Sequence, residues 1–191
     1  MGLTVDVIRD ATTDRVLCDL LTAELDRQLP PHLLVDRSGF LPPTGTWLMF
    51  NKYVALLRDL PAGLRAMATT CRLDSSMEGE DLGWHFCNWH HLGYCDQTSE
   101  GLWELGAWEA AQIFDQAYRL FLPHWDMMDE LVAAGVNELN RWYWASPLND
   151  ALRPLNGRLW EICEESEEFR LMRFSLQYAR RHPERVATES G

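Results

Sequence analysis

The segment from Trp84 to Cys95 holds the chain's densest set of side chains that could bind a metal or act as nucleophiles. Three histidines and two cysteines lie within eleven residues: His85, Cys87, His90, His91 and Cys95. On a helix, Cys87 and His91 would share a face at i and i+4, and zinc accepts both ligand types. The same two residues could also act as a thiolate nucleophile and its base. One hypothesis is therefore a metal-binding protein or metal-dependent enzyme that uses the cluster at 85–95.

The spacing of this cluster argues against both chemistries. Neither CxxC nor HExxH occurs, and Gly93 is expected to end a helix before Cys95. No neighbour supplies the third group that orients a Cys–His pair, and a free cysteine is commonly a small buried hydrophobe. The GxGxxG, GxxxxGK[ST] and GxSxG motifs are also absent. We therefore favour a protein without catalytic residues, and we expect no metal and no cofactor.

Acidic residues are concentrated in the central third of the chain. Between Leu73 and Asn140 there are thirteen carboxylates and one basic residue, Arg119, so this stretch alone accounts for the formal net charge of −12. A field concentrated in this way attracts basic partners, repels nucleic acid and weakens as salt screens it. The arginines elsewhere are scattered, apart from Arg180, Arg181 and Arg185. The charge predicts a basic protein partner and no direct binding of nucleic acid.

Helical spacing brings several of these carboxylates together. Glu100 and Glu104 lie one turn apart, as do Asp126 and Glu130, so each pair shares a face. A mimic of DNA would need carboxylates along a rigid surface, because DNA-binding proteins hold the duplex largely through its phosphate charge. The alternative is a face that only keeps the protein soluble. We predict a partner-binding acidic face that comprises Glu100, Glu104, Asp126, Asp129, Glu130 and Glu138.

A second acidic cluster lies at 161–168, where Arg158, Arg170 and Arg173 can neutralise it. The nearby segment Arg141-Trp142-Tyr143-Trp144 could be an exposed interaction anchor or the inner end of a packed helix. The chain has nine tryptophans, and we expect most of them in the core because buried aromatic rings contribute large apolar area.

Helical periodicity dominates the chain, and no segment alternates as a strand would. The clearest helix places Ala110, Ile113, Phe114, Ala117, Tyr118 and Phe121 on one face and ends at Pro123. A loop rich in proline and glycine is expected at 38–45. We predict helices over 12–29, 47–60, 62–71, 81–92, 96–106, 110–121, 124–144 and 148–163, with a last one from Ser166 to about His182. Asp96 is the expected N-cap of the helix over 96–106. The fold class is all-α, a single compact domain of about eight helices over residues 1–191.

Cysteine usage and hydropathy bear on the compartment. The five cysteines are odd in number, widely spaced and without CxxC, which is typical of reduced thiols in the cytoplasm. The N-terminus does not resemble a secretory signal, and no run of about 20 apolar residues could span a membrane. We expect a cytoplasmic protein that does not contact membranes.

Several short motifs follow one another between Phe86 and Pro123. A helix ends in Phe86-Cys87-Asn88, and Tyr94 and Asp96 follow after a short loop. Next come Leu102-Trp103-Glu104-Leu105-Gly106-Ala107 and a helix that ends in Arg119-Leu120-Phe121-Leu122-Pro123.

This order resembles the DUF4375 family, the DMP19-like proteins. Their pattern is an aromatic-x-Asn helix end, a Tyr-Ala-Asp loop, a Leu-x-x-Ile-Gly-Ala helix end and a helix that finishes in Leu-Phe-Pro. The tail from Pro147 to His182 is similar as well, so the resemblance covers about 81–182. One departure is the family's Asn-Gly-Gly, which corresponds here to Gly79-Glu80-Asp81. The resemblance implies an all-helical fold, no known activity for most members, and a role as an acidic DNA mimic that occupies a DNA-binding protein.

Overall fold

The computed structural model describes residues 2–29 and 47–189, and every regular element within these ranges is a helix. The predicted all-α fold, a single compact domain, is confirmed. The loop predicted at 38–45 lies outside the described residues. The helices are α1 (Val5–Asp10), α2 (Asp14–Gln28), α3 (Trp47–Asp59), α4 (Ala62–Gly79), α5 (Leu82–Asn88), α6 (Leu92–Glu104), α7 (Trp108–Phe121), α8 (Trp125–Ala134), α9 (Val136–Ala145), α10 (Pro147–Glu164) and α11 (Met172–Arg181), with short 3-10 helices η2 (Leu122–His124) and η3 (Pro183–Arg185).

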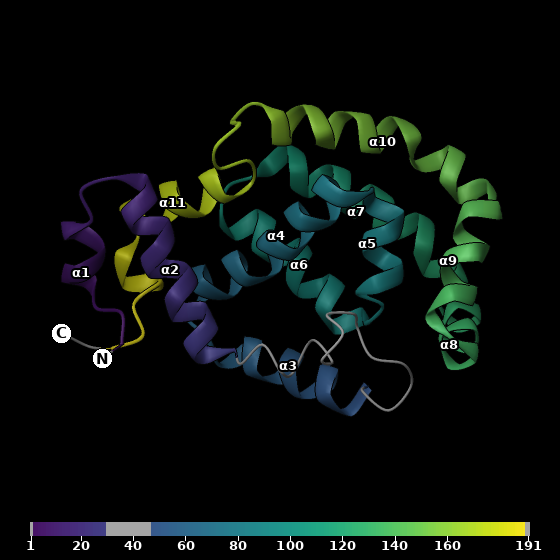
Figure 1. Ribbon diagram of the computed structural model, residues 1–191, viewed down its shortest axis with the longest axis horizontal. Coiled ribbons are helices and arrows are strands. Elements are labelled where there is room, and N and C mark those ends of the chain that lie inside the picture. The colour runs from purple at the N-terminus through teal and green to yellow at the C-terminus, as the bar shows by residue number, and fades with distance from the viewer. Residues whose placement is uncertain (1, 30–46, 190–191) are drawn as a thin grey trace.

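Helices α4 and α6 cross at the centre of the molecule (Figure 1). Their close approach depends on Gly101, since a Cβ atom at this position would lie 2.9 Å from Thr69 Oγ1 and 3.0 Å from the backbone Cα of Ala66. Both helices contribute buried residues to two separate hydrophobic clusters. Leu73 of α4 and Leu102 of α6 belong to one buried cluster, and the N-terminal half of α4 belongs to another.

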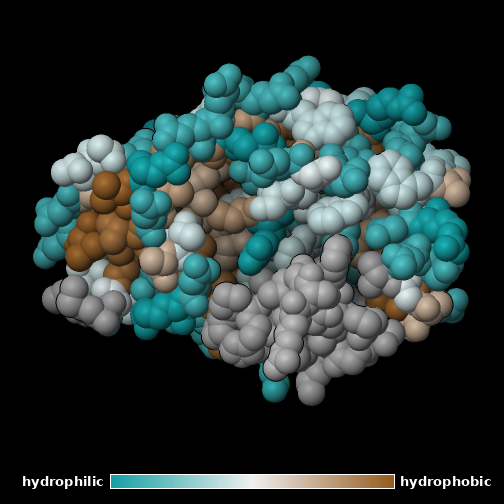
Figure 2. Space-filling model, viewed as in Figure 1, coloured by the Kyte–Doolittle hydropathy of each residue, from teal (hydrophilic) through white to brown (hydrophobic). Residues whose placement is uncertain are grey.

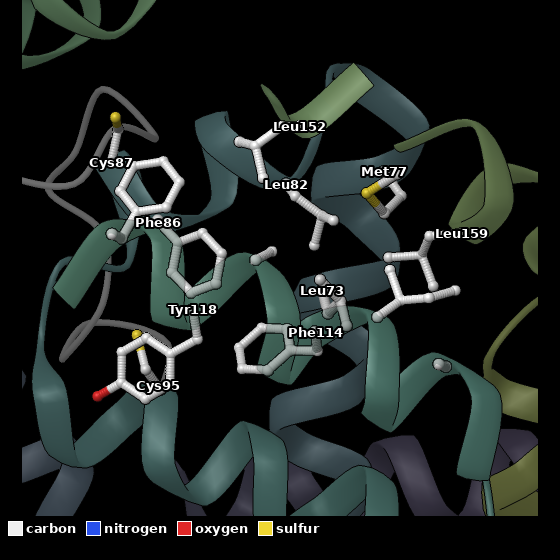
Figure 3. Packing of buried hydrophobic residues seen from close by; sticks show 14 of the residues in the cluster. Leu73, Met77, Leu82, Phe86, Cys87, Cys95, Phe114, Tyr118, Leu152 and Leu159 are labelled. Carbon is white, nitrogen blue, oxygen red and sulfur yellow. The ribbon is translucent and has the colours of Figure 1, made fainter. Parts of the chain in front are cut away.

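The first cluster lies between α4, α5, α7 and α10 (Figure 3). The apolar face predicted for 110–121 forms its largest part, so the clearest predicted helix is confirmed and runs from Trp108 to Phe121. Phe86 of α5 packs against this face, with ring centroids 5.1 Å from Phe114 and 4.7 Å from Phe121. Aromatic pairs at these separations add to the free energy gained from apolar burial.

The second cluster joins the two ends of the chain. It includes Leu17 and Leu21 of α2 and Leu176 of α11, and the backbone N–H of Thr188 donates to the carbonyl of Leu3 at 2.8 Å. Buried Glu24 lies at its edge. Burial raises the pKa of Glu24, but hydrogen bonds from Arg27, Thr188 and Gln28 outweigh burial and lower this pKa to about 2.

Several predicted helix boundaries were wrong. The helix predicted to end at Cys71 continues to Gly79, and a short helix, α1, precedes the first one predicted. Asp96 does not cap a helix but lies inside α6, whose N-cap is His91 (Nδ1 accepts from the Tyr94 N–H at 3.2 Å). The helix predicted over 124–144 is divided at Gly135, which adopts φ +138° and so turns the chain between α8 and α9.

The expectation that most tryptophans lie in the core was also wrong. Among the tryptophan side chains that the structure describes, only Trp89 and Trp125 are buried. Trp103, Trp108, Trp144 and Trp160 are exposed. Hydrophilic residues cover much of the face seen in Figure 2, where apolar areas are visible over α1 and toward the centre.

Candidate protein-interaction surface

The outer face of α6 presents two carboxylates at helical spacing. Asp96 and Glu100 lie one turn apart, and both are exposed. Asp96 is held in place because the Tyr118 hydroxyl donates to its Oδ1 at 3.1 Å. Sequence reasoning missed Asp96 as a surface residue because it assigned this residue to a helix cap. Its i, i+4 spacing to Glu100 was the signal that could have identified it.

The outer face of α8 presents three more carboxylates. Asp126, Asp129 and Glu130 are exposed at i, i+3 and i+4, so they share one side of the helix as predicted for them. Trp125 and Met128 of the same helix are buried and attach it to the core. The charged face of α8 is therefore supported from beneath.

A cluster of aromatic rings joins the two acidic faces. Trp125, the first residue of α8, packs edge-on against Tyr118 (5.9 Å between centroids) and stacks on His90 (4.2 Å). His90 Nε2 lies 2.7 Å from Asp129 Oδ1. Asp96 and Asp129 both raise the pKa of His91, so each lies within electrostatic reach of that residue. We call the five exposed carboxylates of α6 and α8, which are Asp96, Glu100, Asp126, Asp129 and Glu130, the acidic strip.

The histidines beside the acidic strip do not cancel its charge at neutral pH. Burial lowers the pKa of His90, and the opposing effect of its hydrogen bond with Asp129 is smaller. Burial also lowers the pKa of His91, and the nearby Arg58 lowers it further. In the described ranges 2–29 and 47–189, no arginine or lysine forms an ion pair with any of the five carboxylates. No arginine or lysine of the described residues therefore neutralises the strip.

Two predicted members of the acidic face have intramolecular partners instead. Glu104 Oε1 lies 2.9 Å from Arg185 Nη2 and accepts a hydrogen bond from the Tyr178 hydroxyl, which ties α6 to α11 and η3. Glu138 receives two hydrogen bonds from Arg141 Nη1 at 2.7 and 2.8 Å. Glu100, Asp126, Asp129 and Glu130, like Asp96, therefore have no arginine or lysine partner in the described residues, whereas Glu104 and Glu138 form intramolecular ion pairs.

The second acidic cluster is partly neutralised, though not only by the predicted contacts. Arg173 pairs with Glu165 at 2.6 Å, and Arg15 from α2 pairs with Glu168 at 3.0 Å. Arg158 and Arg170 instead pair with Glu109 and Asp74 of the central third.

The histidines and cysteines at 85–95 do not converge on one point. His85 is buried and shares a hydrogen bond with Ser76 (2.9 Å), His90 faces Asp129, and His91 Nε2 faces Asn51 Oδ1 (2.7 Å). Burial lowers the pKa of His85 to about 3 and raises the pKa of the Cys87 and Cys95 thiols, so both cysteines are poor nucleophiles. Within the part of the chain that the structure describes, no three His, Cys, Asp or Glu side chains are arranged to hold a metal ion.

All five cysteines are unbridged. None of the helices in the described ranges combines the length and the apolar character needed to cross a membrane.

A model of the DMP19-like protein family matches residues 58–182, which covers most of the chain and includes α4 through α11. The chain belongs to the DMP19-like family. The match begins earlier than the predicted 81 and supports the DMP19-like part of the resemblance, while the DUF4375 label is untested. No curated protein and no solved structure matches this DMP19-like chain.

Proposed function

We propose that this DMP19-like protein is a non-catalytic interaction protein whose acidic strip binds a basic protein partner in the cytoplasm. The observation that carries the proposal is that Asp96, Glu100, Asp126, Asp129 and Glu130 are exposed and have no arginine or lysine partner in the described residues. Tyr118, which donates to Asp96 and packs against Trp125, links the α6 and α8 carboxylates. Carboxylates that are left unpaired on one surface attract a basic partner and raise its association rate.

The sharpest form of the proposal is a DNA mimic that occupies a DNA-binding protein. Asp96 and Glu100 are separated by about 6 Å along the axis of α6, from a rise of about 1.5 Å per residue. Asp126 and Glu130 repeat this separation on α8. DNA-binding proteins hold the duplex mainly through regularly spaced phosphate charges, so a rigid row of carboxylates can meet the same arginines and lysines.

Two carboxylates of the strip are also held in place, which favours a mimic. The Tyr118 hydroxyl fixes Asp96, and His90 fixes Asp129. Desolvation by burial raises the pKa of Tyr118, so its hydroxyl remains a donor at neutral pH. Carboxylates that are already oriented lose less side-chain entropy on binding than freely rotating ones.

The experiment is a pull-down from lysate of the source cells at low salt, with duplex DNA added as competitor and the retained proteins identified by mass spectrometry. We expect capture of a basic DNA-binding protein that duplex DNA displaces. Retention of a basic protein that DNA does not displace would support the interaction role and contradict mimicry. If the acidic protein retains nothing that a neutral bait does not, the binding role is contradicted.

A further inference from the structure

An open pocket of about 220 Å³ lies away from the acidic strip, between α10 and the link from α4 to α5. One wall is a single face of α10, formed by Asn149, Arg153, Asn156 and Trp160 at i, i+4, i+7 and i+11. Glu80 and Asp81 of the link face this wall, and Trp144 at the end of α9 closes the rest. Figure 1 shows how the end of α9, the start of α10 and α5 meet at this side of the molecule.

A carboxylate without a cationic partner lies at the base of the pocket. Asp81 is 5% exposed and accepts hydrogen bonds from the Trp84 N–H (2.7 Å), the Tyr143 hydroxyl (2.6 Å) and Asn156 Nδ2 (3.2 Å). All three donors are neutral, and no arginine or lysine in the described residues pairs with Asp81. A buried carboxylate without an opposite charge is costly, so a cation that entered the pocket would be stabilised.

The pocket also presents two indole rings that are exposed yet held in place. Trp144 is 48% exposed and packs against Tyr143 at 5.1 Å, and Trp160 is 39% exposed while its Nε1 donates to the Met77 carbonyl at 2.9 Å. Tryptophan faces attract cations more strongly than other aromatic rings do, and a neighbouring carboxylate adds to that attraction.

Charge and size decide the class of ligand. Glu80 is exposed and adds a second negative charge, while the positive charge of Arg153 is already met by Asp150 at 2.5 Å. The pocket is therefore negative, which disfavours phosphates and nucleotides. Its volume is below the range of roughly 300–1,000 Å³ that is usual for cofactor and small-molecule sites, and it suits one side chain.

We propose that this pocket receives an arginine side chain of a protein partner. A guanidinium group is planar, stacks on an indole face and donates several hydrogen bonds to carboxylates at once, whereas an ammonium group offers only a compact charge. The site goes beyond the proposed function, because it is separate from the acidic strip and would stand even if the strip bound nothing.

The test is a titration of the full chain with N-acetyl-arginine amide. Binding is monitored through the NMR signals of the tryptophan indole N–H groups. We expect saturable shifts of the Trp144 and Trp160 signals. The uncharged citrulline analogue should bind at least about tenfold more weakly, since it lacks the cation. The lysine analogue should be intermediate.

Variants locate the binding. Glu80→Gln and Trp144→Ala should each weaken binding of the arginine compound several-fold, because both residues line the pocket at exposed positions. Their matched controls, Glu100→Gln and Trp103→Ala on α6, should bind as the original protein does, even if Glu100→Gln weakens capture of a partner by the acidic strip.

Three results would overturn the proposal: shifts that do not saturate, equal binding of the arginine and citrulline compounds, or unchanged binding by Glu80→Gln and Trp144→Ala. Tighter binding of free arginine than of the blocked amide would replace the protein partner with a small metabolite. Saturable binding of inorganic phosphate through Arg153 would reverse the assigned charge of the ligand.

Discussion

At the scale of single residues, Asp81, Gly83 and Tyr143 position the start of α5. Asp81 caps α5 and accepts from the Tyr143 hydroxyl, and the ring of Tyr143 passes directly over Gly83. A Cβ at Gly83 would lie 1.9 Å from Tyr143 Cζ. Tyr143 is fully buried and cannot move aside. In this segment the close approach to the backbone therefore occurs at Gly83, since Gly79 has no atom within 4 Å of its Cβ position.

Gly83→Ala should destabilise the protein by about 3 kcal/mol, because an inserted methyl group would overlap a buried ring. Gly157→Ala is the matched control. It also adds a methyl group inside a helix, but its Cβ position has no neighbour within 4 Å, so stability should rise by roughly 0.5–1 kcal/mol. Urea denaturation measures the free energy of unfolding of both variants. Equal effects of the two substitutions would show that Tyr143 does not pack over Gly83.

Protonation of His85 should make the protein less stable in mild acid. The pKa of His85 is about 3 in the folded protein, against 6.5 for the exposed side chain. Between these values only the unfolded chain protonates His85, so His85 alone lowers the free energy of unfolding by about 1.4 kcal/mol per pH unit as pH decreases below 6.5. The lowered pKa values of His90 and His91 act in the same direction. Glu24 contributes only below its unfolded pKa of 4.5, which leaves pH 5 to 6.5 for the measurement.

Denaturation curves measured between pH 5 and 6.5 should show that the free energy of unfolding depends less steeply on pH for His85→Gln than for the original protein. The difference in slope should correspond to one bound proton. Ser76→Ala is the control, because it removes the hydrogen bond to His85 and keeps the titrating ring. It should lower stability and leave the slope unchanged. An identical slope for the original protein and His85→Gln would contradict the buried neutral state of His85.

At the scale of helices, prediction succeeded where apolar spacing and a terminator agreed. The helices over 108–121 and 147–164 were found because their apolar faces are continuous and because Pro123 and Pro147 mark boundaries. The predicted helix boundaries were wrong between 81 and 106, where Gly93 was expected to end a helix. The chain instead leaves the helix at Trp89, which has φ −107° and ψ 38°, and the His91 side chain caps the next helix. Such a cap depends on a local conformation that periodicity does not reveal.

The break between α8 and α9 was missed for a related reason. Apolar spacing continues across it, and the only sign is Gly135, whose φ of +138° and ψ of 143° are confined to glycine. This turn lets α9 fold back on α8.

Gly135→Ala should cost about 1–3 kcal/mol from backbone strain alone, because nothing lies within 4 Å of its Cβ position. Gly79→Ala also meets open space but has no positive φ, so it should change stability by less than about 1 kcal/mol. Thermal denaturation followed by circular dichroism compares the two. A neutral Gly135→Ala would argue that α8 and α9 form one straight helix, as first predicted.

At the scale of the whole molecule, composition predicted the sign of the charge and its location in the sequence. It did not predict which carboxylates form ion pairs within the fold. Glu104 and Glu138 were equivalent to Glu100 in sequence terms. Arg185 reaches Glu104 only because the C-terminal segment folds back onto α6, which no local pattern encodes. Asp96 joins the acidic strip for the converse reason, since no arginine or lysine of the described residues pairs with it and the Tyr118 hydroxyl, whose ring packs against Trp125 of α8, donates to it.

Capture of a basic partner should be strongly salt-dependent. Raising the ionic strength from about 0.1 to 1 M shortens the Debye length from roughly 10 to 3 Å, which screens exposed carboxylates such as Glu100 and Asp126. We expect capture at the lower salt concentration to be lost at the higher one. A partner retained in 1 M salt would be held by apolar contacts, and the acidic strip would not be its main determinant.

The most direct measurement compares partner capture by two variants that lose the same number of charges. Asp126→Asn/Asp129→Asn/Glu130→Gln neutralises the α8 part of the acidic strip, and the asparagine at 129 keeps an oxygen for His90. Glu161→Gln/Glu164→Gln/Glu167→Gln neutralises three exposed residues of the second acidic cluster. We predict that the first variant loses capture and the DNA competition that accompanies it, while the second behaves as the original protein. Equal loss of capture by both variants would show that only the net charge of the protein matters. Unchanged capture by the first variant would contradict a binding role for the acidic strip.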